Sequence, residues 1–107
     1  MILMVLARVS FWHFKPGKRE EGFAELDRIL KTLFQIAEGH RGYVSLLSYE
    51  DPNGLTVLTL WQDLETMQKS EKGEFTQAIN KVRDLLEGPP KIENYRVFST
   101  ELFQCPK

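Results

Sequence analysis

Cysteine is almost absent from this sequence, since Cys105 is the only one in 107 residues. A lone cysteine excludes an intrachain disulfide framework, and we expect a reducing, cytoplasmic environment. Histidine is nearly as scarce: His13 and His40 lie far apart, with no carboxylate at ligand spacing to either. We therefore predict no metal site. No phosphate-binding loop or paired-glycine fingerprint occurs, so we also predict that the protein works without a cofactor.

An excess of charge of one sign is lacking as well. Fourteen basic and fifteen acidic residues leave a net charge of −1, and neither sign forms a block. This balance excludes the electrostatic footprint of a nucleic-acid-binding protein. The apolar start from Met1 to Ala7 is interrupted by Arg8 and carries no basic segment. We therefore expect neither a signal peptide nor a membrane span, and no membrane partner.

The length fits one domain over residues 1–107, and the apolar pattern predicts the element order βαββαβ. Strands are expected at 2–14, 43–50, 55–61 and 92–103. Helical regions are expected after Gly17 to about residue 38, and at 64–86 with Asp63 as N-cap and a break near Gly73. The run Asp51-Pro52-Asn53-Gly54 predicts a tight hairpin between the second and third strands.

Two right-handed βαβ units joined by this hairpin predict a ferredoxin-like α+β fold, with a four-stranded antiparallel sheet and two helices on one face. One face of the first strand is uniformly apolar, and we expect it to meet the helices: Leu3, Val5, Ala7, Val9 and Phe11. The other face is then left open, and it carries Leu6, Arg8, Ser10 and Trp12 beside Leu58 and Leu60. Because water would meet a large apolar patch there, we predict a homodimer through this face, with Arg8 in a structural ion pair.

Several short motifs lie at fixed places in this order of elements. They are Lys15-Pro16-Gly17, Gly42-Tyr43, Asp51-Pro52-Asn53, Leu60-Trp61-Gln62-Asp63, Glu65, Ser70, Phe75 and Pro89-Pro90. In these motifs, which extend over nearly the whole chain, the sequence resembles the antibiotic-biosynthesis-monooxygenase group of dimeric α+β barrels. The resemblance implies that fold and a range of activities: cofactor-free oxygenation of quinols and polyketides, haem degradation, or none assigned.

The resemblance also indicates where branch-specific residues would stand. Haem-degrading members carry Asn, Trp and His at positions that Val9, Ser70 and Asn80 occupy here. Polyketide-oxidising members carry Asn and Tyr at the positions of Val57 and Met67. Neither set is present, so the resemblance argues against haem degradation and leaves Trp61 as the one matching residue.

Cofactor-free oxygenation requires a base that ionises the substrate and a dry pocket in which the anion passes an electron to dioxygen. His13 is the candidate catalytic base, because imidazole titrates near about 6.5 and this residue shares a predicted strand face with Phe11. The alternative is a half-exposed strand-end residue with no part in chemistry. His40, between Gly39 and Gly42, is expected in an exposed turn without a catalytic part.

Eight side chains are predicted to face the helices as a substrate-binding set: Val9, Phe11, Val57, Thr59, Trp61, Met67, Phe75 and Ile79. They form either the wall of a pocket for a small apolar or aromatic ligand or plain core, where such stripes are usual. Two functions therefore stand. One is a cofactor-independent monooxygenase acting on a small aromatic, and the other is a non-catalytic dimeric module that binds a small ligand or is structural.

Two other families share the βαββαβ order. An RNA-recognition motif needs a basic, aromatic-rich third strand, whereas residues 55–61 have no charge and a single aromatic. An acylphosphatase needs an anion-binding loop after the first strand, which residues 15–19 do not resemble. Both families are therefore disfavoured.

Overall fold

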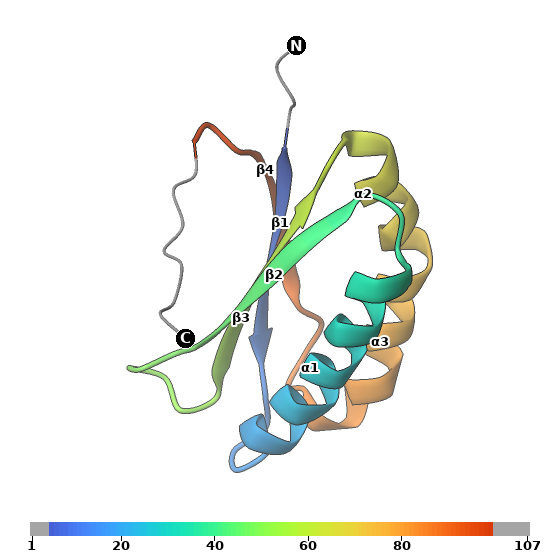
Figure 1. The fold of residues 1–107 in the computed structure, drawn as a ribbon. Helices are drawn as coiled ribbons and strands as arrows, with labels where there is room; N and C mark the ends of the chain where they lie inside the picture. The colour runs from blue at the N-terminus through green and yellow to red at the C-terminus, as the bar shows by residue number, and fades with distance from the viewer. Residues whose placement is uncertain (1–4, 100–107) are drawn as a thin grey trace, which may run out of the picture.

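The computed structural model describes residues 5–99, except for the side chain of Phe34. Its strands are β1 (Leu6–His13), β2 (His40–Leu47), β3 (Gly54–Trp61) and β4 (Lys91–Arg96). Its helices are α1 (Arg19–Ile36), α2 (Leu64–Lys72), α3 (Glu74–Val82) and the short 3-10 helix η1 (Arg83–Leu85). The strands pair antiparallel in the order β2-β3-β1-β4, so β1 and β3 lie at the centre of the sheet (Figure 1). Cys105 and the end of the predicted last strand lie outside the described residues.

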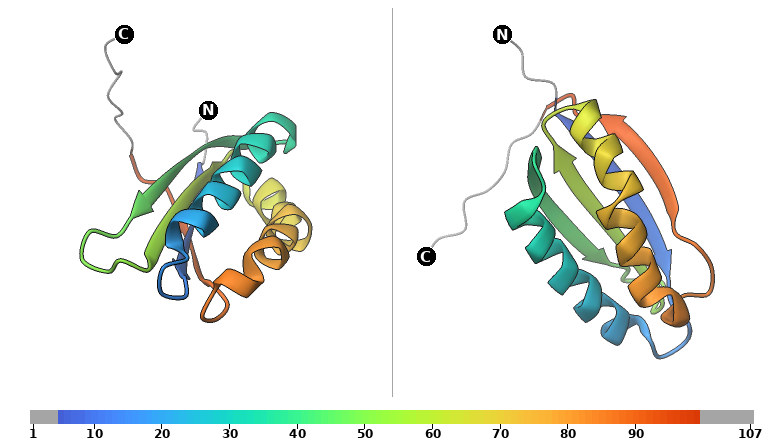
Figure 2. Two further views of the ribbon diagram at one scale, coloured as in Figure 1. Left: turned by 90° about the horizontal axis from the view of Figure 1, so that it is seen from below. Right: turned by 90° about the vertical axis from the view of Figure 1, so that its right-hand side faces the viewer.

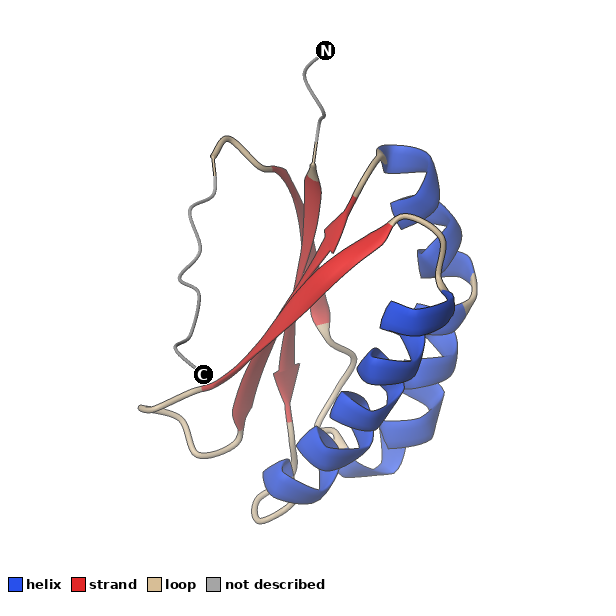
Figure 3. Ribbon diagram, viewed as in Figure 1, coloured by secondary structure: helices blue, strands red, loops and turns tan. Residues whose placement is uncertain are grey.

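The helices α1, α2 and α3 lie on one face of the sheet, and no other described element covers the opposite face (Figure 2, Figure 3). This is the ferredoxin-like α+β arrangement, so the predicted fold class is confirmed. The number of helices is three rather than two, because Gly73, with φ −116° and ψ −94°, leaves the helical region and separates α2 from α3. The break predicted near Gly73 is confirmed. None of the helices within residues 5–99 is long and apolar enough to cross a membrane.

The start of α2 is fixed by its predicted N-cap, Asp63. One carboxylate oxygen of Asp63 accepts hydrogen bonds from the backbone N–H and the hydroxyl of Thr66, both at 2.9 Å. These bonds favour the charged form and lower the pKa of the Asp63 carboxyl, the backbone bond contributing most. The cap thereby sets where the chain leaves Trp61, the last residue of β3, and enters the helix.

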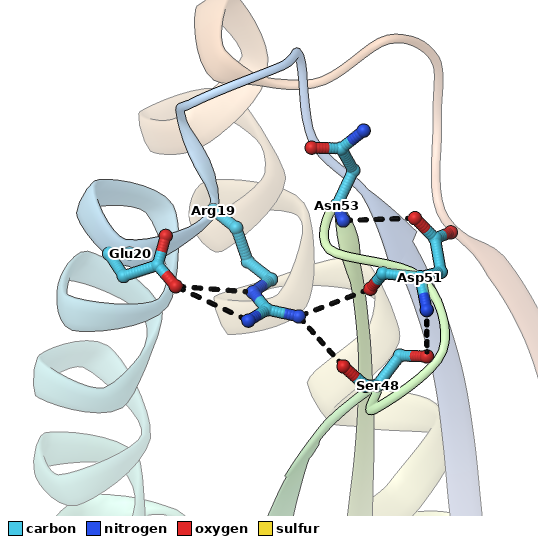
Figure 4. Close-up of polar contacts among 5 residues, drawn as sticks. All are labelled: Arg19, Glu20, Ser48, Asp51 and Asn53. Atoms are coloured by element: carbon cyan, nitrogen blue, oxygen red, sulfur yellow. Dashed lines mark hydrogen bonds and ion pairs between the residues drawn. The ribbon is translucent and has the colours of Figure 1, made fainter.

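The hairpin between β2 and β3 is tied to the start of α1 (Figure 4). Nη1 of Arg19 donates to the carbonyl oxygens of Ser48 at 2.9 Å and Asp51 at 3.1 Å. Within the turn, the N–H of Asn53 donates to Oδ1 of Asp51 at 2.9 Å, which is the local bond expected of an Asx turn. The predicted hairpin is confirmed by the pairing of β2 with β3.

The two faces of β1 are the reverse of those predicted. Residues directly opposite each other in an antiparallel pair point to the same face. Trp12 lies opposite Leu55, and both are buried beneath the helices, whereas Phe11 lies opposite Thr56 and is 39% exposed. Alternation along the strand then assigns every side chain. Leu6, Arg8, Ser10 and Trp12 face the helices, and Ala7, Val9, Phe11 and His13 lie on the open face.

The physical reason lies in what fills the space between sheet and helices. The two buried tryptophan rings lie there, and Arg8 and Ser10 enter the same layer, where Nη2 of Arg8 and the hydroxyl of Ser10 hydrogen-bond to neighbouring residues. Because the space beneath the helices accommodates polar side chains, the more apolar face of β1 does not have to lie there. That face remains for the uncovered side of the sheet, so the prediction that Val9 and Phe11 meet the helices is wrong.

Several element ends differ from the predicted ones. The last strand ends at Arg96, so residues 97–99, which were predicted to continue it, are not strand. The second strand begins at His40, three residues earlier than predicted, because Gly39 adopts φ 80° and turns the chain directly from α1 into β2. The most deeply buried large side chains of the core are Trp61, Phe14, Leu55, Met67 and Val82.

Candidate functional site

A nearly closed space of about 30 Å³, called here the helix–sheet cavity, lies between the sheet and helices α1 and α3. Its sheet side consists of Arg8, Ser10, Trp12, Val57, Thr59 and Trp61. Its helix side consists of Leu26, Ile29, Leu30, Leu33, Glu74, Phe75 and Ala78. A space of this size holds one or two water molecules, so the interface is close to packed in this conformation.

A groove of about 170 Å³, the α1–α3 groove, adjoins this cavity between the two helices. The groove and the cavity share four wall residues: Ile29, Leu33, Glu74 and Ala78. Only a thin layer of side chains therefore separates the cavity from the surface. Movement of these side chains would open a path from the groove to the two tryptophans.

Arg8 is the buried charged group on the sheet side of the cavity. It is 2% exposed, and its guanidinium carbon lies 5.1 Å from the ring centre of Phe75 and 5.5 Å from that of Trp61. Nη2 donates to the carbonyl oxygen of Met67, and Nε lies 3.5 Å from Oε1 of Glu71. Burial lowers the pKa of Arg8, and the carboxylate of Glu71 opposes that shift. The guanidinium nevertheless keeps its charge, since arginine is not deprotonated in proteins.

Both tryptophans of the chain are held in place by hydroxyl groups two residues earlier on the same strand face. The indole N–H of Trp12 donates to Oγ of Ser10 at 2.8 Å. The indole N–H of Trp61 donates to Oγ1 of Thr59 at 2.9 Å. The polar groups of the rings are thus used within the wall, and the rings present apolar surfaces to the cavity.

His40 is buried behind Trp61, not exposed in a turn as predicted. Only 8% of it is exposed, and its ring meets that of Trp61 edge to face, with ring centres 4.9 Å apart. Because the chain turns at Gly39, His40 is the first residue of β2, and this position puts its imidazole against Trp61. Burial, and to a lesser degree the charge of Arg8, lower the pKa of His40 below its ordinary value of 6.5. His40 is therefore neutral at pH 7.

This lowered pKa predicts a loss of stability in weak acid. Below about pH 6.5 the unfolded chain binds a proton at His40 that the folded chain excludes, so the free energy of unfolding falls with pH until the folded-state pKa is reached. The contribution is at most about 1.4 kcal/mol per pH unit. Urea unfolding at pH 7.5 and 5.5 measures it, and His40→Gln should show a smaller difference between the two. Equal differences in both proteins would contradict the neutral state of His40.

A family model described as antibiotic biosynthesis monooxygenase matches residues 4–82, which is most of the chain. The chain belongs to this family. The match spans β1 to α3 and includes every strand and helix that lines the helix–sheet cavity. No curated protein matches the sequence.

Solved structures confirm the fold of this family member. A protein of unknown function from Nitrosomonas europaea superposes with a TM-score of 0.79 at 22% identity, over 96% of this chain and 98% of that one. A conserved protein from Methanosarcina mazei Go1 gives 0.74 at 21%, over 88% and 93%. SnoaB, a cofactor-independent oxygenase from Streptomyces nogalater, gives 0.75 at 14%, over 90% and 95%. At these identities the likeness extends to the fold alone.

In this family member, the residues predicted as a substrate-binding set are divided among four places. Val57, Thr59, Trp61 and Phe75 line the helix–sheet cavity. Met67 is buried next to it and reaches Arg8 through its carbonyl group. Val9 and Phe11 lie on the open face, and Ile79 lines a separate hollow beside Arg83 and Pro89. The eight residues therefore do not form one wall.

His13 lies at the end of β1, outside the helix–sheet cavity. Its side chain is half exposed, with Nε2 at 3.0 Å from Oδ2 of Asp51 and Nδ1 at 3.3 Å from Oε2 of Glu87. It borders an open surface hollow with Asp51 and Thr56. The face prediction for His13 is wrong for the same reason as that for Phe11. Its role as a base stays a prediction, and the structure does not bring it together with Trp61.

The predicted substrate-binding set lacked the apolar α1 residues and Ala78 of the cavity and also the following residues: Arg8, Ser10, Trp12 and Glu74. The first three were assigned to the opposite sheet face. A signal for them is present, because Ser10-x-Trp12 and Thr59-x-Trp61 repeat one spacing on two strands. Glu74 follows Gly73 at the start of α3 and has no comparable signal. Among the described residues, no group of three His, Cys, Asp or Glu is placed to hold a metal ion.

Proposed function

We propose that this chain is a cofactor-independent monooxygenase that acts on a small aromatic, quinol or polyketide-like compound in the helix–sheet cavity. The observation that carries the proposal is a space sheltered from water, in a member of this family, with a guanidinium between two aromatic rings. Flat aromatic walls suit a flat substrate, and a fixed positive charge suits the anion that reacts with dioxygen.

In the proposed reaction the substrate is its own reductant. It loses two hydrogen atoms and gains one oxygen atom, while the second oxygen atom of O₂ leaves as water. A base must first ionise the substrate. Glu74 is the carboxylate on the cavity wall, so we assign it the role that the sequence assigned to His13. Arg8 stabilises the resulting anion, and the closed wall excludes water while an electron passes to dioxygen.

Oxygen uptake by the purified, metal-free protein tests this proposal against a panel of hydroquinones and polyhydroxylated aromatics. We expect turnover with at least one substrate and a loss of kcat of about 10²-fold or more in Glu74→Gln, the usual contribution of a general base. His13→Ala, the control, should keep the wild-type rate. Loss of turnover in His13→Ala with retention in Glu74→Gln would reverse the assignment. No uptake with any substrate, from folded protein, would contradict the monooxygenase.

A second candidate function is a non-catalytic dimeric module that binds a small ligand or is structural. The observation that favours it is the volume of the cavity, since about 30 Å³ leaves no room for an aromatic substrate unless the wall moves. The two candidates differ in what the α1–α3 groove does. An enzyme requires the groove to open toward Trp61, whereas a structural module does not.

We also propose that two copies of the chain pair through the open sheet face. Apolar side chains from three adjacent strands lie on that face: Val9, Phe11, Val44, Leu46, Leu58 and Leu60. Val44 and Leu46 are 45% and 52% exposed in the single chain. A continuous apolar patch of this kind is typical of an interface between subunits.

Leu58 gives a direct test of the pairing, because it lies on a central strand between Val9 and Val44. Leu58→Asp is expected to convert the dimer into monomer, since a buried unpaired carboxylate is strongly unfavourable at an interface. Leu64→Asp is the control, because Leu64 is a leucine on α2, away from the open sheet face and 52% exposed, and this change should leave the dimer intact. Sedimentation equilibrium measures both. A wild-type monomer, or a dimer that survives Leu58→Asp, would contradict this interface.

A further inference from the structure

We propose that Arg8 is an anion-binding residue that accepts a single-ring aromatic compound carrying an ionised oxygen, and that Glu71 is the counter-ion this oxygen displaces. The inference rests on the proposed function in one respect, because it places the ligand in the same helix–sheet cavity. It adds the charge of the ligand and the residue that recognises it.

The first step is the incomplete pairing of Arg8. A guanidinium has five N–H donors, and a buried charge is stable when they are well used. Among the described residues, Nη2 donates to the carbonyl of Met67, while the buried Nε makes no hydrogen bond. Glu71 is 3.5 Å from Nε, close enough for an ion pair but without the geometry of a hydrogen bond. Arg8 therefore retains donor capacity inside the cavity wall.

The second step is that Glu71 can leave. Its side chain is 33% exposed on α2, whereas Arg8 is 2% exposed, so the carboxylate stands at the edge of the cavity and the guanidinium inside it. The hydrogen bond that its carboxylate accepts from Asn94, at 3.4 Å, is long and at the surface. A ligand oxygen that reaches Nε would replace Glu71, and the carboxylate would turn toward water at little cost.

The third step is the shape and character of the walls around Arg8. The rings of Trp61 and Phe75 lie close to the guanidinium, and the rest of the nearby wall is apolar, including Leu26 and Val57, except for the carboxylate of Glu74. The hydroxyls of Ser10 and Thr59 already accept hydrogen bonds from the indole N–H groups. The cavity thus offers stacking surfaces and one cation, which selects a flat apolar body with one negative oxygen, a phenolate or a carboxylate.

Size limits the ligand to about one ring. An apolar cavity of about 150 Å³ holds benzene. The α1–α3 groove adjoining the cavity has about 170 Å³ and shares the wall residues Leu33 and Ala78 with it. A ring that enters from the groove and displaces these side chains would bring its charged oxygen toward Arg8.

Calorimetric titration with benzoate and with benzamide, its neutral counterpart of the same shape, tests the proposal. Benzoate is expected to bind at least about tenfold more tightly, the usual gain from a charged hydrogen bond. Arg8→Met should abolish the preference for benzoate. Glu71→Gln should instead tighten benzoate binding, because it removes the competing carboxylate and keeps the shape. Glu65→Gln, an exposed acid on the same helix, is the matched control and should change nothing.

Arg8→Met is expected to weaken benzoate binding and Glu71→Gln to tighten it, and these opposite changes distinguish ligand recognition from a purely structural role. If Arg8 and Glu71 only stabilise the fold, Glu71→Gln will weaken binding or leave it unchanged, and the proposal is overturned. Equal affinities for benzoate and benzamide overturn it as well. Should Arg8→Met fail to fold, Glu71→Gln decides alone. Preferential binding of benzoate without any oxygen uptake would support the role of Arg8 and refute the monooxygenase. Oxygen uptake with neutral compounds, together with equal affinities for benzoate and benzamide, would support the monooxygenase and refute the role of Arg8.

Discussion

Trp61→Ala is expected to lower the free energy of unfolding by about 3–5 kcal/mol, the usual range for deleting a fully buried aromatic side chain. Trp61 has no exposed surface and is the largest of the fully buried side chains. Its ring contacts His40 and Arg8, and its N–H bonds to Thr59, so the alanine variant loses packing and leaves a hydroxyl without its partner. The helix–sheet layer should be weakened more by this change than by any other single truncation.

Urea unfolding at one fixed protein concentration measures this effect, since association makes stability depend on concentration. Tyr49→Ala is the control, because Tyr49 is an aromatic residue that is 98% exposed on the hairpin. Its change should stay within about 0.5 kcal/mol. A loss below about 1 kcal/mol in Trp61→Ala would mean that the ring is not the centre of the core.

Gly22→Ala is expected to destabilise the protein by roughly 1–3 kcal/mol, the usual range for overpacking a core. Helix propensity alone predicts the opposite sign, because alanine is favoured over glycine inside a helix by about 1 kcal/mol. A Cβ at this position of α1 would lie 2.1 Å from Cε1 of Phe14. Phe14 has no exposed surface, so its ring has little freedom to move aside. The close approach of helix and strand end therefore requires glycine.

Gly88→Ala provides the comparison, because a Cβ there meets nothing within 4 Å and the residue does not have positive φ. Its stability should stay within about 0.5 kcal/mol of wild type. Thermal or urea unfolding of the two variants in parallel measures the difference. A stabilised Gly22→Ala would show that Phe14 can be displaced and that the packing of α1 on β1 is looser than described.

The order of helices and strands could be predicted from the sequence because residues with a known capping, turn or helix-breaking preference lie at the boundaries between them. Asp63 caps α2, the run from Asp51 to Gly54 makes the hairpin, and Gly73 separates two helices. These signals act within a few residues, so they can be predicted from spacing and residue type. The strand order follows from the handedness of βαβ units.

The face of β1 was not predictable by the same rule. Choosing the more apolar face as the one beneath the helices assumes that the helix side is the driest side of the sheet. Here that side contains Arg8 and Ser10, and the most apolar face is the one left for another subunit in our proposal. The repeated hydroxyl-x-Trp spacing was the better indicator, because a small hydroxyl two residues before an indole satisfies its N–H within one strand face.

The candidate site was therefore predicted only in part. The predicted placement of Val57, Thr59 and Trp61 toward the helices agrees with the structure, because side chains two residues apart on β3 share one face. The prediction of an exposed turn at His40 was wrong because the chain turns at Gly39. Strand β2 therefore begins at His40, and its imidazole packs against Trp61. Glu74 belongs to the site through the packing of α3 against α1, a long-range contact that no local pattern encodes.

The indole N–H signals in a ¹H–¹⁵N spectrum test the central claim, that the helix–sheet cavity is the ligand site, most directly. The chain has two tryptophans, and both line the cavity, so these two signals report on it without further assignment. Addition of benzoate is expected to shift both signals in the wild type and neither in Arg8→Met. If neither signal moves at saturating benzoate while backbone signals of the open sheet face do, the site lies elsewhere and the account given for Arg8 and Glu74 is contradicted.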